Sequence, residues 1–245
     1  MPIIPAMAGT LELSILRQPD DSTCGATCLQ ALYGYYDDRV PLETLITDVQ
    51  RLEDGGTLGV YLASHALRRG YDASLFTYNL QVFDPSWFGR EPVDLADRLR
   101  RQMAAKDDPK LRVASQAYID FLGGGGRIFY QDLTPGLLRR YLKRGIPIIA
   151  GMSASYLYHT PREFGPENEY DDVRGTPSGH FMVLCGYDAQ TRRVSVADPW
   201  VPNPGGGHYY DVDIYRLICA ILLGVLTYDA NLLVIHPRKG GGRPR

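Results

Sequence analysis

The stretch that most constrains the fold of this chain runs from Arg17 to Ala31, RQPDDSTCGATCLQA. Its polar cluster, Asp20 to Thr23, is typical of the start of a helix, and the apolar residues that follow recur at helical spacing. The pattern predicts a helix over residues 24–36. Cys24 falls in its first turn, where free backbone N–H groups and the positive end of the helix dipole favour a thiolate. The chain therefore meets the first requirement for a cysteine nucleophile.

Composition excludes several classes of protein. The chain has 245 residues, of which 44% are hydrophobic and 22% charged, as expected for one globular domain with a substantial core. The net charge of −2 does not favour a nucleic-acid partner. The N-terminus lacks the pattern of a signal peptide. The longest apolar run, residues 217–226, is too short to span a bilayer and predicts a buried helix. We expect a cytoplasmic protein without a membrane span.

The cysteines do not form a disulfide or metal-binding pattern. The chain has four of them, Cys24, Cys28, Cys185 and Cys219, too few for a disulfide framework in a chain of this length. No pair of CxxC motifs is present, so we expect neither a metal nor a cofactor. We expect Cys28, Cys185 and Cys219 to pack in the core.

Hydrophobic periodicity divides the chain into three parts. The first part predicts three helices and a closing strand, over 24–36, 41–52, 58–69 and 71–78. The middle part predicts an irregular segment and two helices, over 93–105 and 111–122. The last part predicts helices over 134–144 and 215–223 and strands over 146–152, 209–213 and 232–236. It also predicts a long polar loop over 156–179 and a hairpin over 180–198.

This order predicts the α+β class. We expect a single domain over residues 1–237, in which a helical lobe (12–76) packs on an antiparallel sheet lobe (132–237). Residues 77–131 form an insertion between the two lobes. Residues 238–245, which are basic and rich in glycine, are predicted to be a disordered tail.

The hairpin over 180–198 supplies candidate partners for the thiol. If its turn centres near residues 189–190, cross-strand positions lie close together and alternate residues share a face. The predicted pairs are Leu184 with Val194, Met182 with Val196, and His180 with Asp198. Asp198 would fix the tautomer of His180 and favour the imidazolium, so that His180 can act as the base of the nucleophile.

Three further residues complete the candidate site. The side-chain amide of Gln18, six residues before Cys24, can stabilise an oxyanion together with the backbone N–H of Cys24. Gly179 leaves space beside His180, and Trp200 follows Asp198 closely enough to form a wall of the groove. We therefore assign Gly179 and Trp200 to substrate binding.

The motifs resemble those of a known family. The run QPDDSTCGATCL (residues 18–29), the LETL of residues 42–45, and a helix ending in Arg69-Gly70-Tyr71 are similar to the bacteriocin-processing "double-glycine" cysteine peptidases, a papain-like group. The runs GHFMVLCGYD (179–188) and VSVADP (194–199) are similar to the second motif of that family. The resemblance covers residues 17–76 and 132–200.

The resemblance implies a papain-like cysteine peptidase without a cofactor, acting on a peptide or protein. Carried over by motif, the nucleophile is Cys24, the base His180, the orienting residue Asp198 and the oxyanion donor Gln18. Many relatives are fused to a transporter, whereas this chain has no such segment, so cleavage after a Gly-Gly leader is not implied. Two other functions remain open: an acyltransferase or transpeptidase using the same acyl-enzyme, and a catalytically inactive peptide-binding relative.

Overall fold

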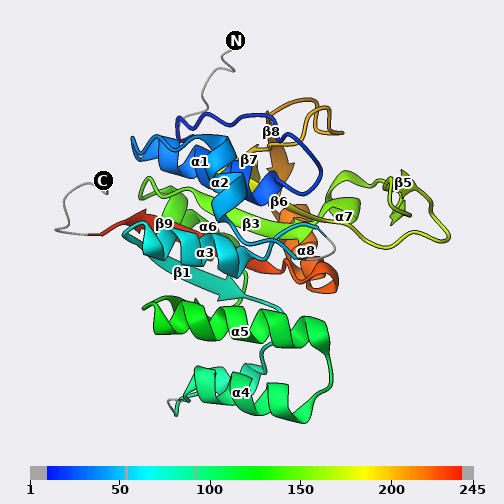
Figure 1. Ribbon diagram of the computed structural model, residues 1–245. Helices are drawn as coiled ribbons and strands as arrows, with labels where there is room; N and C mark the ends of the chain where they lie inside the picture. The colour runs from blue at the N-terminus through cyan, green and yellow to red at the C-terminus, as the bar shows by residue number, and fades with distance from the viewer. Residues whose placement is uncertain (1–9, 53–54, 92, 239–245) are drawn as a thin grey trace.

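The computed structural model describes residues 10–52, 55–91 and 93–238, and it confirms the predicted α+β class. The three N-terminal helices, α1 (Cys24–Tyr35), α2 (Leu42–Asp48) and α3 (Gly59–Arg68), lie on one face of a mostly antiparallel sheet (Figure 1). α1 begins at the expected cysteine and extends over the residues whose apolar spacing predicted it. Of the predicted tail, residues 239–245 lie outside the described part of the chain.

The sheet has seven strands in the described residues, in the order β2-β1-β9-β3-β6-β7-β8. Every pairing is antiparallel except that of β1 with β2. The strands are β1 (Tyr71–Thr77), β2 (Arg127–Phe129), β3 (Ile148–Ser153), β6 (Gly179–Asp188), β7 (Arg193–Ala197), β8 (Tyr209–Asp213) and β9 (Asn231–Pro237).

Both faces of the sheet are covered, and strand alternation assigns side chains to the two faces. On β6, Phe181 and Val183 belong to the core cluster shared with α1 and α3, whereas Met182 and Leu184 belong to the cluster shared with α6 (Pro135–Leu142) and α8 (Ile214–Leu223). All six residues of β3 are buried, which explains why its sequence is a continuous apolar run and not an alternating one.

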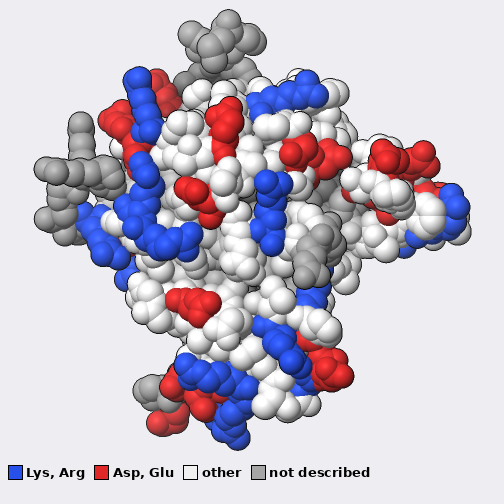
Figure 2. Space-filling model, viewed as in Figure 1, with Lys and Arg blue, Asp and Glu red and all other residues white. Residues whose placement is uncertain are grey.

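The middle segment forms a helical hairpin at the edge of the fold. After the 3-10 turn η1 (Pro85–Phe88) come α4 (Leu95–Ala105) and α5 (Pro109–Gly123). Asp94 and Asp108 cap the two helices by accepting from Asp97 N and Leu111 N. α4 buries only Leu99, and on the face in Figure 2 its region carries positive and negative side chains side by side. The segment ends in β2, which joins the main sheet.

Two expectations for the last part are wrong. The loop over 156–179 is interrupted by α7 (Ala154–Tyr158) and by a small hairpin, β4 (Glu163–Phe164) and β5 (Glu169–Tyr170), which projects beside the sheet in Figure 1. The apolar run that predicted a buried helix is instead half-exposed. α8 packs only one face on the sheet, so Cys219 and Leu222 face outward, as does Leu226 in η2 (Gly224–Thr227).

Candidate active site

The turn before α1 fixes the position of Cys24. Asp20 O accepts a bond from Thr23 Oγ1 (3.0 Å), and Asp20 N donates to the same hydroxyl (3.2 Å). Thr23 therefore closes the turn instead of capping the helix, contrary to the usual role of a threonine in this position. The helix begins at Cys24, which is 8% exposed, so this residue lies in the first turn, where backbone N–H groups have no partner within the helix.

His180 and Asp198 are joined by side chains beyond the end of the strand ladder. His180 Nε2 lies 2.9 Å from Asp198 Oδ1. The predicted register is wrong by two residues, because Leu184 pairs with Val196 and the last pair is Val183 with Ala197. The cause is the position of the turn, because Val194 pairs with Tyr187, three residues from the predicted Leu184. A bulge between Leu184 and Gly186 then shifts the ladder by one residue and reduces the offset to two.

The Asp198 carboxylate is fully buried and is surrounded by donors. Its Oδ1 also accepts from Trp200 N (3.0 Å), and its Oδ2 accepts from Tyr158 Oη (2.5 Å) and Tyr210 Oη (2.6 Å). His208 accepts at its carbonyl from Asp198 N (2.8 Å). A buried carboxylate with this many donors remains ionised.

Sequence reasoning missed the two tyrosines. Tyr158 comes from α7 and Tyr210 from β8, two elements that no local pattern brings together. The large number of tyrosines in the chain was the only available signal, and it does not point to particular positions.

The surroundings of His180 and Asp198 favour a protonated imidazolium and an ionised carboxylate. Burial of His180 disfavours the imidazolium, but the Asp198 charge and hydrogen bond outweigh burial and raise the pKa of His180 to about 10. Burial likewise opposes ionisation of Asp198, but His180 and the two tyrosine hydroxyls hold the pKa of the carboxyl below its usual range.

Cys24 lies on the other side of the His180 ring. Its thiol is close enough to the ring to help raise the pKa of His180. Because Nε2 is occupied by Asp198, the nitrogen facing the thiol is Nδ1. A thiol, an imidazole and a carboxylate thus meet in one site, the set of groups that proton transfer between sulfur and ring requires.

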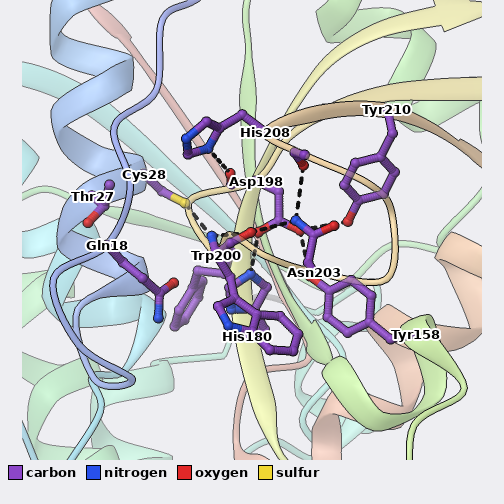
Figure 3. Close-up of polar contacts among 12 residues, drawn as sticks. Gln18, Thr27, Cys28, Tyr158, His180, Asp198, Trp200, Asn203, His208 and Tyr210 are labelled. Carbon is purple, nitrogen blue, oxygen red and sulfur yellow. Dashed lines mark hydrogen bonds and ion pairs between the residues drawn. The ribbon is translucent and has the colours of Figure 1, made fainter.

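Two hydrogen bonds hold Gln18 beside the same site. Its backbone N–H donates to Pro199 O (2.9 Å), next to Asp198, and its Nε2 donates to Asp20 O (2.9 Å). Figure 3 shows the Gln18 side chain on the side of the site toward α1. The carbonyl of Asp20 fixes which end of the amide is nitrogen, and Nε2 keeps a second N–H for another acceptor.

Gly179 and Trp200 both border His180. Gly179 is the exposed first residue of β6, directly before the histidine. The indole of Trp200 lies 6.3 Å from the His180 ring and 5.2 Å from that of Tyr158, between centroids. Both positions are therefore at the edge of the site, as a substrate-binding role requires.

The remaining cysteines are separate from this arrangement. Cys28 is fully buried and donates to Phe181 O (3.3 Å), which ties α1 to β6. Cys185 is buried, as expected, whereas Cys219 is exposed and the prediction of a core position is wrong. Over residues 10–52, 55–91 and 93–238, no cluster of three or more His, Cys, Asp or Glu side chains could hold a metal ion.

A cysteine at a helix start, facing an imidazole and a carboxylate on a sheet, is the arrangement of a papain-like thiol enzyme. The sequence model of the Peptidase_C39 like family matches residues 131–218, which include His180 and Asp198. No curated protein sequence matches the chain. Within the described residues, no helix is long and apolar enough to cross a membrane.

Three solved structures are similar over most of the chain. A double glycine motif protease from an AMS/PCAT transporter, in complex with the leader peptide, is 15% identical and covers 97% of this chain and 100% of its own (TM-score 0.45). A C39-like peptidase from Bacillus anthracis is 12% identical and covers 93% and 96% (0.49). Xylellain, a cysteine protease from Xylella fastidiosa, is 16% identical and covers 94% and 85% (0.42).

Proposed function

We propose that this chain is a cysteine peptidase that hydrolyses a peptide or isopeptide bond. The observation that carries the proposal is the position of His180, which hydrogen-bonds to the Asp198 carboxylate through Nε2 and lies close enough to the Cys24 thiol for the two to interact. The family match over residues 131–218 supports the same class of reaction.

In the first half-reaction the sulfur of Cys24 attacks the carbonyl carbon, while its proton resides on His180. The developing oxyanion accepts from the backbone N–H of Cys24 and from the second N–H of Gln18 Nε2. The C–N bond then breaks as His180 gives its proton to the leaving amine. A thioester with Cys24 remains.

In the second half-reaction water adds to the thioester carbonyl. His180, now neutral, takes a proton from this water, and the same two N–H groups stabilise the second oxyanion. Collapse releases the carboxylic acid and restores the Cys24–His180 pair. Asp198 stays ionised throughout and keeps the ring oriented.

A second cysteine of the chain provides an internal control for a test of the reactivity of the Cys24 thiol. Cys219 is exposed and free, and it lies on α8 outside the site. We expect iodoacetamide to alkylate Cys24 faster than Cys219 at pH 6, because the neighbouring His180 can take the proton of the Cys24 thiol. Mass spectrometry of the two cysteine peptides over pH 5–9 measures both rates.

The His180→Ala variant should lose this advantage, and Cys24 should then react no faster than Cys219 at pH 6. If Cys24 in the unaltered chain reacts no faster than Cys219 at any pH, the peptidase proposal fails and a non-catalytic binding role takes its place.

Gln18→Ala tests the oxyanion donor. We expect kcat to fall by about 10²–10³, since this is the usual effect of one missing donor, while the alkylation rate of Cys24 is retained. Gln18→Glu is the matched variant, because it keeps the size of the side chain but replaces the donor by a carboxylate. A kcat for Gln18→Ala within threefold of the unaltered chain would contradict the role of Gln18.

The proposal extends to substrate and compartment. The complex of the double glycine motif protease contains a leader peptide, which supports a peptide or protein as the substrate here. All four cysteines are free thiols, as expected in the reducing cytoplasm. Trapping of the acyl-enzyme, followed by mass spectrometry with and without amine acceptors, distinguishes hydrolysis from acyl transfer.

A further inference from the structure

One segment of the chain carries positive charge without matching negative charge. Between Asp132 and Glu163 the sequence has no aspartate or glutamate, yet residues 139–144 include four lysines or arginines. None of these residues takes part in the proposed reaction. Helix α6 and the turn after it are therefore strongly cationic, although the net charge of the whole chain is −2.

Packing of α6 turns its cations outward. Leu137, Leu138 and Leu142 are buried in the core cluster on this face of the sheet, which leaves the opposite face of the helix to solvent. The exposed cations on and just after α6 are Arg139, Arg140, Lys143 and Arg144. Because residues three and four apart are neighbours on a helix surface, these side chains form one compact group.

A fifth cation lies beside this helix. Phe129 of β2 stacks on Phe76 (5.1 Å between centroids), and Phe76 contacts Tyr141 of α6 (5.8 Å), so β2 borders the helix. Arg127 is exposed and lies two residues before Phe129, so by strand alternation it points to the face that α6 covers. We call the five side chains the α6 patch: Arg127, Arg139, Arg140, Lys143 and Arg144.

The α6 patch has no carboxylate partners within the described chain. Over residues 10–52, 55–91 and 93–238, none of its five side chains forms an ion pair within 4.0 Å. The negative end of the helix dipole favours cations in the last turn of α6, but this effect is confined to that turn and does not account for Arg127. Like charges gathered in this way create a positive surface potential that attracts an external anion.

The side chains of the α6 patch suit a membrane surface better than a protein partner. A protein interface depends on aromatic or apolar side chains that become buried at its centre. In the described residues, the exposed large apolar side chains lie on other elements and not on β2 or α6. Anionic lipid head groups need no such anchor, because they are attracted to clustered lysines and arginines by charge alone.

We infer that the α6 patch binds the surface of a membrane that contains anionic lipids. The core cluster that includes α6 lies across the sheet from the cluster that includes α1, the helix that carries Cys24. Attachment through the α6 patch therefore leaves the face with the nucleophile free to receive a peptide.

The experiment measures sedimentation of the protein with sucrose-loaded vesicles. The vesicles consist of phosphatidylcholine alone or of an equal mixture of phosphatidylcholine and the anionic lipid phosphatidylglycerol. Binding is measured in about 0.1 M salt and in about 1 M salt, where the Debye length falls from about 10 Å to about 3 Å. Two variants that each lose four positive charges are compared with the unaltered chain. The α6 variant combines Arg139→Gln, Arg140→Gln, Lys143→Gln and Arg144→Gln. The α4 variant combines Arg98→Gln, Arg100→Gln, Arg101→Gln and Lys106→Gln and controls for net charge.

In the lower salt, we expect the unaltered chain and the α4 variant to bind the anionic vesicles about tenfold or more tightly than the α6 variant, since each cation at such a surface strengthens binding by about fivefold. The higher salt should release the protein. If the unaltered chain binds anionic vesicles no better than neutral ones, the inference is wrong, and this result requires no folded variant. Binding of a fluorescent DNA duplex in place of the vesicles leads to the same conclusion.

Unchanged binding of the α6 variant, or an equal loss in the α4 variant, also overturns the inference. Hydrolysis of a soluble peptide should be retained in the α6 variant, which shows that this variant folds. The peptidase proposal stands whatever the vesicles show, because it is tested by Cys24 alkylation in their absence.

Discussion

Replacement of Cys24 by alanine is expected to abolish peptide hydrolysis, with kcat falling by a factor of about 10⁴ or more. The thiol forms the covalent bond to the acyl group, and no other group in the site can replace it. The measurement is single-turnover and steady-state hydrolysis of a cleaved peptide. Since Cys24 is small and nearly buried, alanine fills most of its space, and the melting temperature should change by only a few degrees.

Cys219→Ala is the matched control for this experiment. It removes a thiol from the exposed face of α8 and should leave hydrolysis unchanged. Activity that survives in Cys24→Ala, or that disappears in Cys219→Ala, would place the nucleophile elsewhere and contradict the proposed reaction.

Asp198→Asn is expected to lower kcat by about 10³–10⁴ at neutral pH, the effect of placing the catalytic histidine in the wrong tautomer. The carboxylate accepts from His180, Trp200, Tyr158 and Tyr210. An amide keeps only one acceptor oxygen, so its NH₂ group must face one of these donors.

The same variant makes a spectroscopic prediction. Asp198 is the group that raises the pKa of His180 to about 10 against the effect of burial. Without that charge the pKa of His180 should fall, and less imidazolium should be present at neutral pH. Titration of the His180 ring by NMR measures this directly.

Tyr210→Phe serves as a comparison, because it removes one donor from Asp198 and keeps the charge. It should lower kcat much less than Asp198→Asn. A kcat for Asp198→Asn within tenfold of the unaltered chain, or an unchanged pKa of His180, would show that Asp198 does not orient the base.

Local chemistry explains why much of the fold could be predicted. Helix starts, glycine stops and apolar spacing are short-range signals, and they located α1, α3 and β1 to within one or two residues. The same signals placed Cys24 at a helix start. They failed for α8, because an apolar run does not reveal that only one of its faces meets the sheet.

In the active site too, the sequence predicted which residues meet but not the strand register that brings them together. His180 and Asp198 were predicted to meet, and they do, but not through the predicted register. The turn pairs Val194 with Tyr187 instead of Leu184, and the bulge between Leu184 and Gly186 shifts the ladder by one residue. The 2.9 Å contact is made by side chains past the end of the ladder. A bulge of this kind depends on packing against other strands, so no signal within the hairpin announced it.

The sequence by itself determined the reactive elements: a cysteine at a helix start, a glutamine before it, and a histidine and an aspartate on one hairpin. Each follows from short-range patterns in the chain. Only the tertiary structure decided the surroundings that tune them. Tyr158 of α7 and Tyr210 of β8 meet at the carboxylate of Asp198. Such contacts depend on the order of the strands in the sheet, which brings together residues that are far apart in the chain.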